Sequence, residues 1–156
     1  MEHNATVDTL TLAKAAFNAT WDLLEAEPWS DEDRRQLLVL AMGSRHLWEL
    51  SGDACGPEQR STGDWLISHV ASRIGEPQLA MRFAQAAHDC VVAQGWEGWR
   101  LASAEEGLAR ACAALGDLVG RDLHAQLCRD LLETLSPEDR NVIEPQLASI
   151  PGLSHP

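Results

Sequence analysis

The sequence predicts an all-α protein built from about seven antiparallel helices. Apolar residues recur with helical spacing along nearly the whole chain. No sustained stretch alternates apolar and polar residues between turn residues, as a half-buried strand would. The length of 156 residues suits one compact core or one short array of repeats. We therefore expect a single helical domain over residues 1–156.

The first pair of helices is expected in residues 8–50. Residues 8–26 place apolar side chains on one face and polar or charged side chains opposite, which is typical of a surface helix. Ser30 caps the next helix, and Asp33 stands where a capping box places its acidic residue. This helix is apolar over a wide arc, so we expect it to be the most buried helix. Residues 51–56 are expected to form a non-helical connector.

Further helix pairs are expected in residues 58–93 and 98–135. Pro57 suits the first turn of a helix that ends at Gly75, and Pro77 follows a tight turn into the next helix. Gly116 and Asp117 form the turn inside the last pair. In the helix after this turn, regularly spaced leucines predict a stripe that faces inward. These leucines are Leu123, Leu127, Leu131 and Leu135.

A capping helix is expected over residues 137–149. Ser136, Pro137 and Asp139 together give a strong signal for the start of a helix. Pro145 lacks the N–H that a helix interior uses, so we expect it to kink or stop this helix.

Composition and charge exclude several classes of partner. The net charge of -12 repels a phosphate backbone, so we expect no nucleic acid as a partner and no docking on anionic lipid. The apolar run from Leu37 to Met42 is far shorter than the ~20 residues of a membrane span. No charged-then-apolar signal opens the chain, and the cysteines form no CxxC pair. These features predict a cytoplasmic protein with reduced thiols.

A helix–turn–helix unit recurs within the chain. Superposing the turn at Gly75 on the turn at Gly116 brings apolar or small residues into register on both sides. The aligned residues are Ile67 with Leu108, Ser68 with Ala109, Ala71 with Cys112, Ala84 with Ala125, and Val91 with Leu132. Such a unit buries its apolar face by stacking on its neighbours.

The repeated unit resembles the tetratricopeptide repeat (TPR). Ile67 and Ser68 stand for the large–small pair of the first helix, Gly75 stands in its turn, and Ala80 and Ala87 stand for the small positions of the second helix. The order of the motifs in residues 44–48, 63–65 and 106–117 is also similar to that of small uncharacterised actinobacterial TPR-like proteins. The resemblance implies helix pairs stacked as a right-handed superhelix, and it implies no activity.

The resemblance also implies a binding face, because the first helix of each pair lines a concave groove in TPR arrays. Carrying that face onto this chain gathers aromatic and charged side chains that could receive a carboxylate or phosphate. These are Trp65, His69, Arg73, Glu106 and Arg110, and Trp99 is added from the loop before the fifth helix. The alternative reading is that Arg73 and Arg110 pair with neighbouring glutamates on solvated helix faces.

Signals for catalysis or metal binding are weak. There is no GxSxG motif and no glycine-rich phosphate loop. Glu105 and Glu106 are adjacent on a helix and therefore point in different directions, so they do not form a carboxylate dyad. His124 and Cys128 share one helix face, but no second close pair completes a zinc site. We expect no cofactor and no metal, and the sequence leans away from an enzyme.

The leading hypothesis is a non-enzymatic module that binds a protein or peptide through the predicted groove. The alternative is a small-molecule-binding protein or a cryptic enzyme, with a pocket where tryptophans from different helix pairs meet Arg45 and His46 around an anionic ligand. A third reading is a homodimer. The predicted binding residues are Arg45, His46, Trp48, Trp65, His69, Arg73, Trp99, Glu106 and Arg110.

Overall fold

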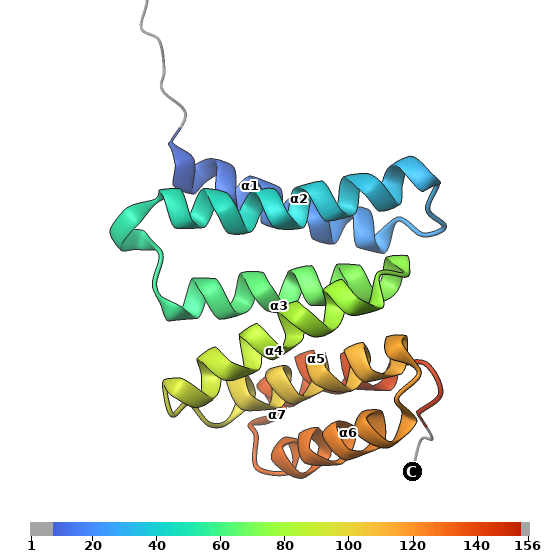
Figure 1. The fold of residues 1–156 in the computed structure, drawn as a ribbon. Coiled ribbons are helices and arrows are strands. Elements are labelled where there is room, and N and C mark those ends of the chain that lie inside the picture. Colours follow the sequence, from blue (N-terminus) through green and yellow to red (C-terminus); the bar gives the residue numbers. More distant parts are fainter. Residues whose placement is uncertain (1–7, 154–156) are drawn as a thin grey trace, which may run out of the picture. The chain divides into compact units, whose positions relative to one another are not determined.

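The computed structural model describes residues 8–153, and this range contains seven α-helices, one 3-10 helix and no strand (Figure 1). The all-α prediction is therefore confirmed. The helices are α1 (Thr9–Glu25), α2 (Asp31–Leu50), η1 (Gly52–Ala54), α3 (Pro57–Ile74), α4 (Pro77–Ala93), α5 (Trp99–Leu115), α6 (Leu118–Leu132) and α7 (Pro137–Ala148). The chain divides into two compact units, unit 1 (Met1–Gly63) and unit 2 (Asp64–Pro156), with the boundary inside α3. The single-domain organisation stays a prediction.

Unit 1 is built on the hairpin of α1 and α2. The buried hydroxyl of Ser44 on α2 donates a hydrogen bond of 2.8 Å to the carbonyl of Ala13 on α1. The predicted capping box is present, since Ser30 and Asp33 each accept a bond from the other's backbone N–H. These bonds lower the pKa of Asp33. The connector at residues 51–56 contains η1, so the expectation of a wholly non-helical segment is wrong.

The two superposed turns have the same geometry. Gly75 and Gly116 have φ values of 89° and 78°, in the left-handed region that favours glycine. The N–H of the next residue returns to a helix carbonyl in each case: Glu76 bonds to Ala71 and Asp117 bonds to Cys112, both at 2.9 Å. This pattern is a Schellman motif, which satisfies carbonyls that a helix end leaves unpaired. The two turns therefore share one helix-ending geometry, which also occurs at Gly95, where Trp96 bonds to Val91 at 3.2 Å.

The most buried helix is α5, and the prediction that this would be the second helix is wrong. In α5, Ala102 and every residue from Ala104 to Cys112 are buried, whereas α2 buries only Leu37, Ala41 and Ser44. The reason is position, because α5 packs against α4, α6 and α7 within unit 2. A helix with neighbours on several sides has little surface left for water.

Two residues of the predicted leucine stripe, Leu123 and Leu127, face outward on α6, contrary to the prediction. The buried side of α6 consists of Ala125, Cys128 and Leu132, which pack in one core with Ala102 and Ala109 of α5. Leu131 and Leu135 are partly buried and pack against this core, so the prediction is confirmed for these two residues. Small side chains on both helices allow the backbones to approach closely, which favours this side over the bulkier leucines.

Helix α7 continues through Pro145 to Ala148, so the expected stop at this proline does not occur. A proline inside a helix leaves one carbonyl of the preceding turn without its N–H partner. That carbonyl belongs to Asn141, an exposed residue, so water can supply the missing donor. Ile143 and Leu147 pack into the core that α5 and α6 form, and this packing holds the helix in place.

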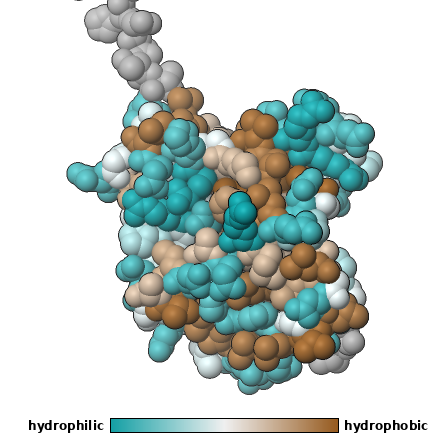
Figure 2. All heavy atoms as spheres, viewed as in Figure 1, coloured by the Kyte–Doolittle hydropathy of each residue, from teal (hydrophilic) through white to brown (hydrophobic). Residues whose placement is uncertain are grey.

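The surface of unit 2 mixes polar and apolar side chains, and apolar patches lie among polar ones over α6 (Figure 2). Among the helices of residues 8–153, none is long and apolar enough to cross a bilayer.

Candidate functional site in the charged interior of unit 2

Helix α5 carries charged side chains into the interior of unit 2. Glu105, Glu106 and Arg110 are all buried, and Glu106 is 0% exposed. The two glutamates serve different neighbours: Glu105 bonds to side chains of α4 and α6, and Glu106 bonds to side chains of α3 and α5 itself. Their divergence follows from the helical turn between adjacent residues. Buried charges need partners, and each of these has them.

The carboxylate of Glu106 is fully paired. Its Oε1 accepts from the guanidinium of Arg110, at 2.9 Å from Nε and 2.8 Å from Nη2. Its Oε2 accepts from the indole Nε1 of Trp65 at 3.1 Å. The i,i+4 pairing of Glu106 with Arg110 is therefore present, although it is buried and not on a solvated face. In a low-dielectric interior this pair is stable only because both groups are satisfied.

Arg110 also binds the C-terminal end of α7. Its Nη2 donates to the carbonyl of Gln146 at 2.6 Å and to the hydroxyl of Ser149 at 2.8 Å. The last carbonyls of a helix have no partner inside the helix and carry partial negative charge. A cation at this position caps α7. The guanidinium of Arg110 therefore binds both the carboxylate of Glu106 on α5 and the C-terminal end of α7.

His69 lies against this network as a neutral side chain. Its ring stacks on Trp65, with 5.1 Å between the ring centroids and 25° between the planes. Burial, together with the positive charges of Arg110 and Arg73, holds the pKa of His69 well below the usual 6.5. At neutral pH this histidine is therefore an uncharged packing element.

Glu105 joins three helices through two histidines. His88 on α4 lies with Nε2 at 2.9 Å from Glu105 Oε1, and His124 on α6 lies with Nδ1 at 2.7 Å from Oε2. Each imidazole places one ring nitrogen within hydrogen-bond distance of one carboxylate oxygen, and a ring N–H at that position donates to the oxygen. The arrangement holds α4 and α6 against α5. We refer to His88, Glu105 and His124 as the histidine clasp.

Replacement of Glu105 by alanine is expected to lower the free energy of unfolding by about 2–3 kcal/mol, because two charge-assisted hydrogen bonds are lost. Glu105→Gln keeps one acceptor oxygen and should lose less. The matched control is Asp130→Ala on α6, which removes an exposed carboxylate that accepts only from Gln126 at 2.8 Å. We expect the control to change stability by less than about 0.5 kcal/mol in urea unfolding. Equal losses for Glu105→Ala and Asp130→Ala would contradict the clasp.

Gly107 gives Trp65 room to reach Glu106. A Cβ at Gly107 would lie 3.1 Å from Cδ1 and 3.4 Å from Nε1 of Trp65, closer than ordinary contacts. Trp65 has little freedom to retreat, because its Nε1 bonds to Glu106 and its ring stacks on His69. The glycine in the middle of α5 is therefore explained by the close approach of an indole ring.

Gly107→Ala is expected to destabilise the protein by about 1 kcal/mol, although alanine favours a helix by about 1 kcal/mol over glycine. The reason is that the added methyl group displaces Trp65 from Glu106. Gly43→Ala provides the control, since a Cβ at Gly43 in α2 meets nothing within 4 Å. Chemical unfolding of the two variants should give changes of opposite sign. A stabilised Gly107→Ala protein would show that Trp65 moves aside without loss.

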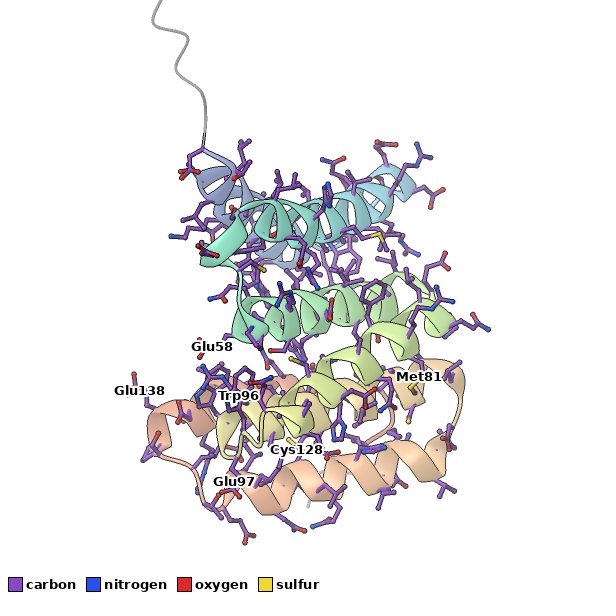
Figure 3. The ribbon with its side chains drawn as sticks, turned by 60° about the vertical axis from the view of Figure 1, so that its left-hand side comes forward. Glu58, Met81, Trp96, Glu97, Cys128 and Glu138 are labelled. Atoms are coloured by element: carbon purple, nitrogen blue, oxygen red, sulfur yellow. The ribbon has the colours of Figure 1, made fainter. Side chains whose placement is uncertain are left out.

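The buried thiols are held in their protonated form. Burial and the charge of Glu106 and Glu105 raise the pKa of Cys128 to about 12, and Figure 3 shows this residue between α5 and α6. Burial is also the main cause that raises the pKa of Cys55 and Cys112. A thiol needs to ionise to act as a nucleophile or metal ligand. Within residues 8–153, no three His, Cys, Asp or Glu side chains are placed to hold one metal ion.

The predicted binding residues fall into both units. In unit 1, Arg45 bonds to Glu49 at 2.8 Å, and Arg60 binds the same carboxylate. These two cations hold the pKa of Glu49 at about 2. His46 is exposed and Trp48 is half-buried. Because Trp65 and Trp99 belong to unit 2, the small-molecule pocket stays a prediction.

Within unit 2, the structure brings together four of the predicted residues. Trp65, His69, Glu106 and Arg110 form the network described above, and the charge of Arg73 acts on His69. Trp99 takes another role at the start of α5, where the guanidinium of Arg100 lies 4.6 Å from its ring centroid. Figure 3 shows Trp96, the other tryptophan that Arg100 contacts, in the loop before α5.

The histidine clasp is not predictable from the sequence. His124 is spaced to share a helix face with Cys128, and no pattern in the sequence links either histidine to Glu105. The clasp depends on contacts between three helices, with 17 residues between His88 and Glu105 and 19 between Glu105 and His124. The helical turn between adjacent residues does predict that Glu105 and Glu106 point to different sides of α5 and so have different neighbours.

Comparisons with known proteins find no matching family model, no matching curated protein and no matching solved structure.

Proposed function

We propose that this chain is a non-enzymatic helical module that binds another polypeptide, with its helix pairs stacked in a TPR-like manner. The observation that carries the proposal is the outward position of Leu123 and Leu127 on α6. Leu123 and Leu127 are exposed, and Val119 on the same side is 82% exposed. Apolar side chains collected on one helix face are typical of protein–protein interaction sites.

The chemistry of the interior supports a binding role over a catalytic one. Glu106 and Arg110 neutralise each other, and Glu105 is bonded to His88 and His124. A general acid or base needs a proton that it can exchange with a substrate, and a nucleophile needs to be activated. The bonds of these residues hold helices together, and the buried thiols Cys55, Cys112 and Cys128 have raised pKa values.

The contacts inside unit 2 favour the outer face of α6 as the proposed binding surface over the buried residues of the predicted groove. His69, Glu106 and Arg110 are buried, and the latter two use their polar atoms within unit 2. They support the fold of unit 2 in this proposal, whereas the outer face of α6 meets the partner. In this proposal Leu123 and Leu127, which the sequence assigned to the core, contact the partner in place of the buried His69, Glu106 and Arg110.

Native mass spectrometry of the full chain, gently purified from the cells that make it, tests the proposal. We expect a complex that contains the 17.1 kDa chain and a second polypeptide that denaturation releases. A bound small molecule without a second polypeptide would favour the alternative of a metabolite-binding protein. A mass at a multiple of 17.1 kDa would favour the homodimer, and a bare chain would contradict a stable interaction module.

A further inference from the structure

We propose that the outer face of α6 docks a basic, amphipathic helix of another protein. This inference rests on the proposed function and names the class of partner that the module would bind. The face consists of an apolar row, Val119, Leu123 and Leu127, and an acidic edge, Asp122, Asp130 and Glu133. All of these side chains are exposed.

The apolar row runs along the length of α6. Its members are spaced at i, i+4 and i+8, so they lie one above another on the same side of the helix. Leu118 at the start of α6 and Leu115 at the end of α5 are also exposed. A partner that covers this row must run alongside α6. A helix does so with apolar residues at i, i+3, i+4 and i+7, which is a recurring mode of peptide recognition.

The acidic edge determines the charge of the partner. Asp122, Asp130 and Glu133 recur with helical spacing beside the apolar row. Arg121 bonds to Asp122, and Arg129 lies on α6 next to Asp130. Three carboxylates therefore stand against two guanidinium groups, and the edge remains negative by one charge. Lysine or arginine residues beside the partner's apolar stripe would complement this edge and favour association.

The charge of the whole chain argues against a second copy as the occupant. Two molecules that each carry a net charge of -12 repel each other, and an isologous contact on α6 would bring two acidic edges close together. A basic partner removes this repulsion and gains long-range attraction instead. The charges on this face therefore favour a basic helix of a different protein as the partner.

A pair of designed peptides tests the proposal with the full chain. The probe is a fluorescent helical peptide of leucine and lysine, with leucines on one face, and its counterpart replaces each lysine by glutamate. The test variant is Leu123→Ser with Leu127→Ser. The matched control is Leu50→Ser on α2, because Leu50 is 58% exposed and Leu123 is 57% exposed. Far-UV circular dichroism confirms that each variant is folded.

We expect the lysine peptide to bind the unmodified chain and the Leu50→Ser control with equal affinity. Its affinity for the α6 variant should be lower by a factor of at least about ten. The glutamate peptide should not bind. A second variant, Asp130→Lys with Glu133→Lys, should weaken the lysine peptide and reduce the salt dependence of its binding. Equal affinity of the lysine peptide for the unmodified chain and the α6 variant would overturn the proposal.

Two further results separate this inference from the proposed function. If the polypeptide seen by native mass spectrometry binds the α6 variant as tightly as the unmodified chain, the interaction module stands and the α6 site is wrong. If sedimentation shows a dimer that Leu123→Ser with Leu127→Ser makes monomeric, the face is a self-association surface. That result would overturn the assignment of a basic partner.

Discussion

Arg110→Ala is expected to lower the free energy of unfolding by about 3–5 kcal/mol, because it leaves the carboxylate of Glu106 charged and buried without its cation. Glu106 is 0% exposed, so water cannot take over the lost bonds without local opening of unit 2. The same change removes the donors to Gln146 and Ser149 at the end of α7. Guanidinium unfolding at neutral pH, followed by circular dichroism, measures the loss.

Two controls separate the burial of the ion pair from a general loss of charge. Arg35→Ala breaks an exposed pair with Glu32 of similar N–O distance, 3.0 Å, and should cost less than about 1 kcal/mol. The double change Glu106→Gln with Arg110→Met removes both charges and keeps an acceptor oxygen for Trp65. We expect it to destabilise less than Arg110→Ala alone, since no unpaired charge remains. If Arg110→Ala were as mild as Arg35→Ala, the interior would already be hydrated.

Local features of this fold were predictable from the sequence because they depend on neighbouring residues. The capping box at Ser30 and the shared turns at Gly75 and Gly116 formed as expected. The Glu106–Arg110 pair also formed, since i,i+4 spacing brings the two side chains together on any helix. The burial of this ion pair depends on contacts with α3 and α7. The residues near Glu106 in the sequence do not predict those contacts.

The outward leucines of α6 show where helical periodicity is ambiguous. Periodicity identifies a face on which apolar residues recur, but α6 has two such faces. One contains Leu123 and Leu127, and the other contains Ala125, Cys128 and Leu132. Close packing against the alanines of α5 selected the second face, and that choice depends on the shape of another helix. Packing on α5 therefore leaves Leu123 and Leu127 exposed on the proposed docking surface.

The stability of the protein is expected to fall in acid through His69. The pKa of His69 in the folded protein lies well below 6.5, whereas in the unfolded chain it returns to about that value. Below pH 6.5 the unfolded chain therefore binds a proton that the folded protein does not. The stability that His69 contributes is fully present above this pH. It is lost by up to about 1.4 kcal/mol per pH unit as the pH falls toward the folded-state pKa.

His69→Phe isolates this effect, because phenylalanine can stack on Trp65 and does not titrate. The difference in unfolding free energy between the unmodified protein and the variant should shift in favour of the variant between about pH 7 and about pH 5. All other titrating groups cancel in this difference, provided that the variant is folded at both values. A difference that stays constant would mean that His69 is protonated equally in the folded and unfolded states. The folded protein would then have to stabilise an imidazolium beside Arg110 and Arg73, whose charges oppose it.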